Sequence, residues 1–140
     1  MNVLLPFGLL TSAPLQPSAE LRAVLRQAFG YPALRQYLTH PGARPLVFRY
    51  DARPVYQNRP LSRPTFDVPL PGQPTICYAA APQDSLDKRN VFIVVRELRI
   101  DRDPAVVRQL IPYEGVVGRF RLGKGPKGEW RVRKAEVVEQ

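Results

Sequence analysis

The residues that could perform acid–base or nucleophilic chemistry are few in this chain. General acid–base catalysis usually relies on a positioned histidine, and the one histidine, His40, lies in a Thr-His-Pro-Gly turn. The one cysteine, Cys77, stands within a β-prone run and is interpreted as a small buried apolar residue. Three carboxylates close to β-type segments could act as a base, and their spacing selects none of them: Asp51, Asp67 and Glu114. The sequence leaves enzymatic activity open and favours a non-catalytic protein.

Metal and cofactor motifs are absent from the sequence. One cysteine and one histidine cannot supply the four ligands of a structural zinc site, and Asp101 and Asp103 alone do not make a calcium loop. The run from Gly123 to Gly128 resembles a phosphate-binding loop only superficially, because the order G-x-x-x-x-G-K-S/T is missing and a strand follows it. We therefore expect no cofactor and no metal, and we expect this run to be a hairpin loop.

A basic hairpin is the best candidate site. Apolar residues recur at every second position in Val116–Leu122 and again from Trp130 to Val132, which is typical of strands that bury one face. We expect residue 122 to pair with residue 130, and 120 with 132. This register would place Arg121 opposite Arg131 and Arg119 opposite Arg133. The candidate residues for binding an anion or a partner are therefore Arg119, Arg121, Arg131 and Arg133.

The arginines of this hairpin would need an anionic neighbour. Like charges directly opposite each other destabilise a sheet, and either Glu97 or Glu129 could supply the counter-charge internally. The formal net charge of +9 favours an external anion such as nucleic acid. Aromatic side chains do not alternate with the arginines, which argues against the stacking of single-stranded bases. The sequence does not decide whether these arginines form a solvated surface or a functional one.

The bulk properties indicate one domain. A chain of 140 residues with 44% hydrophobic residues can bury a core of its own. The apolar start, Met1–Leu10, lacks a preceding basic residue and is too short to span a bilayer. We expect residues 1–17 to be flexible or loosely packed, residues 18–140 to form a single α+β domain, and no membrane span. These features favour a soluble protein, in the cytoplasm rather than exported.

Hydrophobic periodicity predicts a main helix near the N-terminus. Apolar residues between Ala19 and Phe29 form one stripe at helical spacing. Ser18 is the expected N-cap, and Gly30 is the expected left-handed C-cap. A second helical segment is expected from Pro32 to Leu38.

Strand signals occupy most of the remaining chain. Leu46–Tyr50 and Pro54–Tyr56 lie among many prolines and are expected at the edge of the sheet. Thr75–Ala81 is a further strand, and Val91–Ile100 belongs in the sheet centre because it is apolar on both faces. Ala105–Ile111 fits either a strand or a short helix. The predicted fold is α+β, with a mostly antiparallel curved sheet packed on one main N-terminal helix.

The order of these elements resembles the cystatin-like/NTF2-like α+β superfamily. The resemblance covers residues 19–29 and 90–138 and rests on Phe120-Arg121-Leu122, a glycine-lysine turn and Gly128-Glu129-Trp130-Arg131-Val132. It implies a curved sheet that wraps a helix and forms a cone or groove for small ligands, protein partners or catalysis. It carries no catalytic residue onto this chain.

The function expected from the sequence is that of a non-catalytic binding or interaction module, acting through the concave face of the sheet or through the basic hairpin. Its partner would be a protein or a small molecule, and a homo-oligomer is left open. One alternative is a binder of nucleic acid or another polyanion. Another is a small NTF2-like enzyme with a carboxylate base.

Overall fold

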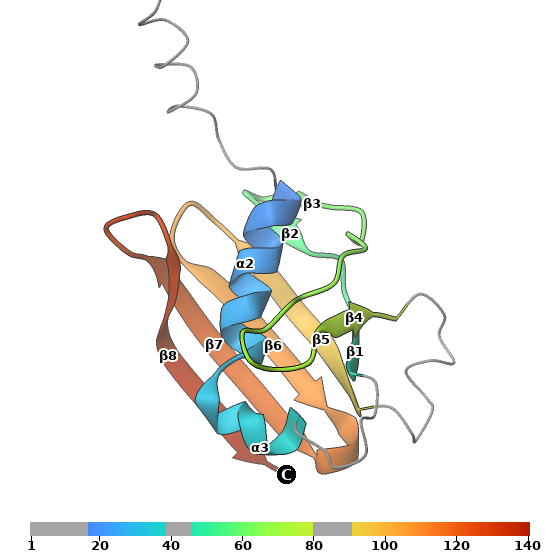
Figure 1. The fold of residues 1–140 in the computed structure, drawn as a ribbon. Helices are drawn as coiled ribbons and strands as arrows, with labels where there is room; N and C mark the ends of the chain where they lie inside the picture. The colour runs from blue at the N-terminus through green and yellow to red at the C-terminus, as the bar shows by residue number, and fades with distance from the viewer. Residues whose placement is uncertain (1–16, 39–45, 80–90) are drawn as a thin grey trace, which may run out of the picture.

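The fold is α+β, as the sequence predicts, with one main helix packed against a mostly antiparallel sheet (Figure 1). The structure is a computed structural model that describes residues 17–38, 46–79 and 91–140. Of the expected loose segment 1–17, residues 1–16 lie outside the described residues, as does the turn around His40, while Pro17 already belongs to a helix. No described helix is long and apolar enough to cross a membrane.

Four long strands form an antiparallel meander that runs from the middle of the sheet to one of its edges. They are β5 (Val91–Ile100), β6 (Ala105–Ile111), β7 (Val116–Lys124) and β8 (Trp130–Glu139). The ambiguous segment is thus the strand β6. Its exposure alternates along the chain, as it would for β-branched residues on a half-buried surface.

The other edge of β5 is occupied by parallel strands. Strand β1 (Leu46–Tyr50) pairs with the first half of β5, and β2 (Val55–Tyr56) pairs with its end. Two short strands complete the sheet: β3 (Arg59–Pro60) pairs with β2, and β4 (Ile76–Tyr78) pairs with β1. The prediction that the segments of β1 and β2 lie at an edge is therefore wrong, because β1 and β2 are each paired on both sides. The apolar side chains on both faces of β1 suit a strand that is paired on both sides.

Helix α2 (Pro17–Phe29) covers one face of the meander (Figure 1). Its predicted apolar stripe is buried, including Leu21 and Leu25 at 0% exposure. Burying such a stripe supplies most of the driving force for packing a helix on a sheet. The second helical segment is also confirmed, as the 3-10 turn η1 (Pro32–Leu34) followed by α3 (Arg35–Leu38).

Both predicted caps of α2 are wrong. The helix begins at Pro17, so Ser18 lies inside its first turn. At the other end, the Gly30 N–H still donates to the Arg26 carbonyl at 3.0 Å, and the φ of Gly30 is not positive. A Cβ at Gly30 would come within 2.9 Å of that carbonyl oxygen. The glycine is therefore explained by close backbone approach rather than by a left-handed conformation.

Candidate anion-binding face

The hairpin of β7 and β8 exists, but its register differs from the predicted one. Leu122 pairs with Val132, and Trp130 pairs with Lys124. The turn is shorter than expected, because Gly125 N–H donates to the Glu129 carbonyl at 2.7 Å. A β-bulge then interrupts β8 between the pairs Leu122–Val132 and Arg121–Lys134. The predicted pairings of Arg121 with Arg131 and of Arg119 with Arg133 are therefore wrong.

All four predicted arginines are exposed, and each has a different neighbour. Arg119 lies opposite Glu136, with 3.1 Å between Arg119 Nη1 and Glu136 Oε1. Arg121 lies opposite Lys134. Near the turn, Arg131 Nε is 3.8 Å from Glu129 Oε1, and Arg133, the unpaired residue of the bulge, donates from Nη2 to the Lys124 carbonyl at 3.0 Å. The strand centre and the turn therefore form two separate basic regions.

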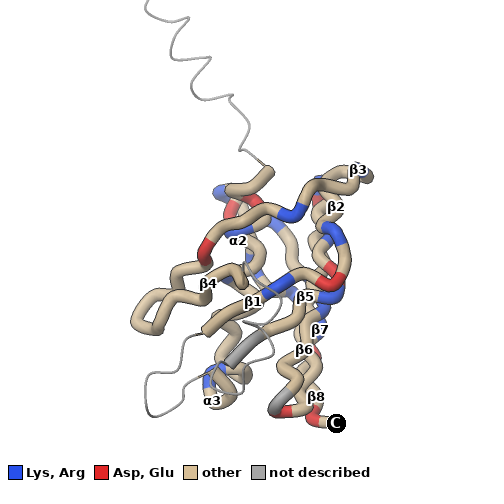
Figure 2. The backbone as a smooth tube through the Cα atoms, turned by 90° about the vertical axis from the view of Figure 1, so that its right-hand side faces the viewer, with Lys and Arg blue, Asp and Glu red and all other residues tan. Residues whose placement is uncertain are grey.

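The strand-centre region extends across the sheet on the face opposite α2, which we call the open face. Figure 2 shows Lys and Arg at several positions along these strands. One cross-strand row runs through Arg99, Val106, Arg121 and Lys134. Its three cations have no carboxylate among them. We call these four residues the cationic row.

A neighbouring row on the open face is balanced. It runs through Glu97, Arg108, Arg119 and Glu136. Each glutamate pairs with the adjacent arginine, Glu97 with Arg108 at 3.2 Å and Glu136 with Arg119 at 3.1 Å. The expected internal counter-charge from Glu97 thus exists, but it serves Arg108, while the cationic row is left without one.

Sequence reasoning missed the contribution of β5 and β6 to this face. Arg96 and Arg99 of β5 and Arg108 of β6 all belong to it, and so does Lys134 of β8. The available signal was the position of these cations between inward-facing apolar residues of their strands. The register that aligns them with β7 depends on long-range pairing, which spacing in one strand does not reveal.

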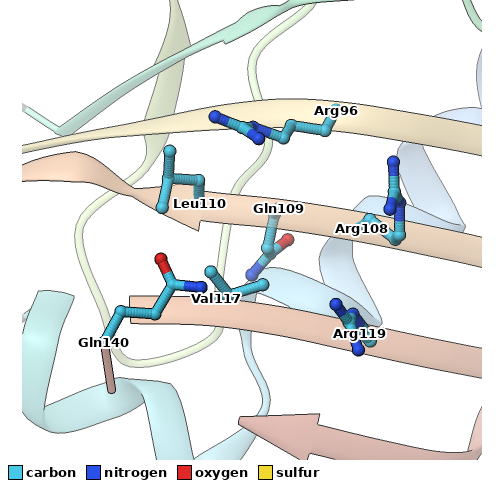
Figure 3. A pocket seen from close by; sticks show the side chains of 7 residues that line it. All are labelled: Arg96, Arg108, Gln109, Leu110, Val117, Arg119 and Gln140. Atoms are coloured by element: carbon cyan, nitrogen blue, oxygen red, sulfur yellow. The ribbon is translucent and has the colours of Figure 1, made fainter. Parts of the chain in front are cut away.

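A depression of about 130 Å³ lies on the open face beside the balanced row (Figure 3). Arg96, Arg108 and Arg119 all line it, and in Figure 3 the Arg96 side chain extends toward Leu110, away from Arg108. Leu110 and Val117, which pair with each other across β6 and β7, contribute an apolar part. Gln140 lies at one end (Figure 3).

The face under α2 carries a separate polar cluster. The Glu20 carboxylate, only 6% exposed, accepts a hydrogen bond from Tyr56 Oη at 2.5 Å and lies 3.0 Å from Lys124 Nζ. The hydrogen bond to Glu20, with a smaller contribution from burial, raises the pKa of Tyr56 to about 12. Lys124 Nζ also lies 5.2 Å from the centre of the Trp130 ring, within cation–π range. The cluster joins α2 to β2 and to the end of β7.

The carboxylates considered as a base lie at the surface. Asp51, Asp67 and Glu114 are all exposed. Asp51 lies 3.7 Å from Arg49 Nη1, and Asp67 accepts the Tyr78 N–H at 3.1 Å. Among the described residues, the carboxylate that is buried is instead Glu20, in the first turn of α2.

The interpretation of Cys77 as a buried residue is wrong, because its side chain is exposed. Ile76, its neighbour in β4, takes the inward position and is 0% exposed. Since successive residues of a strand face opposite sides, Cys77 points away from the core. Partial burial, and then the nearby Asp67, raise the pKa of its thiol.

Comparisons of the chain with protein-family models, with curated proteins and with solved structures found no match. The open face and the cluster under α2 must therefore be interpreted from their own chemistry.

Proposed function

We propose that this protein is a non-catalytic binding module whose open face binds the phosphate backbone of a nucleic acid. The observation that carries the proposal is the cationic row, in which Arg99, Arg121 and Lys134 share one line across the sheet with no carboxylate. Arg121 and Lys134 are direct cross-strand neighbours, an arrangement that costs stability unless an anion lies nearby. A row of phosphates supplies that anion and releases counterions on binding.

The opposite face of the meander is less suited to a partner. It is filled by α2 and by buried apolar side chains, among them Leu98, Val107, Phe120 and Leu122. A ligand there would have to displace the helix. This argument favours the open face over the concave-face alternative considered from the sequence.

The side chains of the open face favour contact with phosphates rather than with bases or lipids. The cationic and balanced rows contain no aromatic residue, whereas base stacking needs one. Membrane insertion needs exposed apolar side chains, and among the described residues Val138, at 45% exposure, is the one large hydrophobic residue that is exposed. Phosphate contacts carry no sequence information directly, so we expect little sequence specificity.

The test is the salt dependence of binding to a short DNA duplex, measured by fluorescence anisotropy. We expect affinity to fall steeply between about 50 and 200 mM salt. The double variant Arg99→Gln/Arg121→Gln should lower the slope of log affinity against log salt by about 2, since each phosphate contact contributes about 0.9.

The matched control is Arg26→Gln/Arg63→Gln, which removes the same charge from exposed positions on α2 and on the segment after β3. It should change the slope much less. Equal effects of the two double variants would mean that net charge, not the open face, drives binding. Salt-insensitive binding, or none at 50 mM salt, would contradict the proposal.

We also infer a relationship to the cystatin-like/NTF2-like superfamily. Its support is the general arrangement of one main helix packed on a mostly antiparallel sheet, together with the Gly-x-Trp-x-Val run that opens β8. Fold likeness of this kind does not determine function.

A further inference from the structure

We propose that the depression beside the balanced row binds a terminal phosphate, the phosphomonoester at the end of a nucleic acid strand. This inference rests on the proposed function and names a subsite of the same face. The three cations that would hold the phosphate are Arg96, Arg108 and Arg119, one from each of three neighbouring strands (Figure 3).

Arg96 is available for a ligand. It is the extra residue in the β-bulge of β5, between the pairs formed by Val95 and Glu97. Bulges redirect a side chain from the regular alternation of a strand and are frequent beside binding sites. Arg96 is exposed, and within the described part of the chain it has no ion-pair or hydrogen-bond partner.

The other two arginines are oriented in advance. Arg108 and Arg119 lie directly opposite each other on β6 and β7. A glutamate on the far side holds each one through a single close nitrogen–oxygen contact, at 3.2 Å for Arg108 and 3.1 Å for Arg119. A guanidinium has five N–H donors, so each arginine retains donors for a phosphate. The flanking glutamates therefore position Arg108 and Arg119 and leave some of their N–H donors free to bind a phosphate.

The charge and the shape of the depression favour a phosphate at a strand end. The side chains of the three arginines and two glutamates sum to a charge of +1 before the cationic row beside them is counted. A monoester carries about −1.5 to −2 at pH 7, more than the single charge of a phosphodiester. At about 130 Å³ the depression can take a phosphate, and it adjoins a wider depression of about 320 Å³ over the cationic row that shares Arg108 and Arg119. Gln140 lies at one end (Figure 3), which suits a group that continues in only one direction.

The experiment compares two blunt DNA duplexes that are identical except for a 5′-phosphate or a 5′-hydroxyl. Affinities are measured by competition anisotropy at one fixed salt concentration. Since hydrogen bonds to charged groups are worth about a factor of ten or more in affinity, we expect the native protein to prefer the phosphorylated duplex by about tenfold. Arg96→Gln should abolish this preference while retaining binding to both duplexes.

The control variant is Arg99→Gln, on the same strand and the same face but outside the depression. It should weaken binding to both duplexes and keep their ratio. Equal binding of the two duplexes by the native protein would overturn the terminal-phosphate site and leave the proposed function standing. No binding of either duplex would contradict the proposed function itself.

Inorganic phosphate separates a site for a strand end from a site for the free anion. We expect it to compete with the phosphorylated duplex only at concentrations far above the protein's affinity for DNA, because the duplex also contacts the cationic row. If inorganic phosphate bound more tightly than the phosphorylated duplex, the ligand of the depression would be a free anion rather than a strand end. That result would overturn the inference.

Discussion

Gln109 is a buried polar side chain whose hydrogen-bonding groups are unused. It lies in β6 at 1% exposure and is one of the residues that line the depression (Figure 3), and neither its amide nitrogen nor its amide oxygen has a partner among the described residues. Burying such a group without partners costs about 1–3 kcal/mol. Gln109→Met keeps the length and removes the polar atoms, so we expect it to raise the free energy of unfolding by about 1 kcal/mol, measured by urea denaturation.

The control for this substitution is Gln109→Glu, which keeps the shape and adds a buried charge. It should destabilise the protein at pH 7. A loss of stability in Gln109→Met would contradict the prediction and show that the amide is hydrogen-bonded in solution.

For single residues, the sequence predicted which side chains are buried better than it predicted which residues they contact. The inward positions of Leu25, Phe120 and Trp130 follow from periodicity alone, and all three are buried. The neighbours of Arg121 and Glu20 could not be predicted in this way, because they depend on the bulge at Arg133 and on the packing of α2 against β7. Periodicity determines which face a residue occupies, but not which residue stands opposite it.

Three elements, α2, β2 and β7, meet at Glu20, and their connection should make stability depend on pH. The pKa of Tyr56 is about 12 in the folded protein, against an ordinary value of 10. As the pH rises from 10 to 12, Tyr56 ionises in the unfolded chain while it stays protonated in the folded one. The stabilisation is therefore complete below pH 10 and is lost towards pH 12.

We expect Tyr56→Phe to be less stable than the native protein at pH 7 and to decline less between pH 10 and 12. The measurement is the difference in unfolding free energy between the two proteins as a function of pH, which cancels the titration of the other tyrosines. A difference that stays constant across this range would show that the hydrogen bond to Glu20 does not couple to folding.

For the elements, the sequence predicted the strands of the meander and missed how the parallel strands dock. The predicted run Val91–Ile100 coincides with β5, and its apolar character on both faces correctly placed it inside the sheet. Nothing in Leu46–Tyr50 specifies a parallel partner, because that pairing joins segments distant in the chain. Local patterns therefore predict elements better than their neighbours.

Across the whole molecule, we expect the excess of positive charge to lower the stability of the fold and to raise the affinity for DNA. Lys134→Glu would place a carboxylate directly opposite Arg121 and lower the formal net charge from +9 to +7. An opposite-charge pair in this position contributes about 0.2–1 kcal/mol. We expect the variant to unfold at a higher temperature and to bind duplex DNA more weakly.

Thermal unfolding at low salt and anisotropy with the same duplex measure the two effects of Lys134→Glu separately. Lys127→Glu, in the exposed turn between β7 and β8, changes the net charge equally and serves as the control. Lower stability of Lys134→Glu, or unchanged DNA binding, would contradict the prediction. It would show that the cationic row does not reduce stability for the sake of binding.

Strand β5 pairs with parallel strands on one edge and with an antiparallel strand on the other. This arrangement affects the order in which the chain folds. The partner of β5 on one side, β6, and the strands β7 and β8 beyond it follow through short connections, so their contacts can form quickly. The partners of β5 on the other side come much earlier in the sequence. Leu46 pairs with Val91, which lies 45 residues later in the chain. During synthesis from the N-terminus, β1 and β2 therefore leave the ribosome before the strand that will hold them. Pro54 directly precedes β2 and Pro60 lies in its partner β3, where they discourage pairing with other chains during that interval.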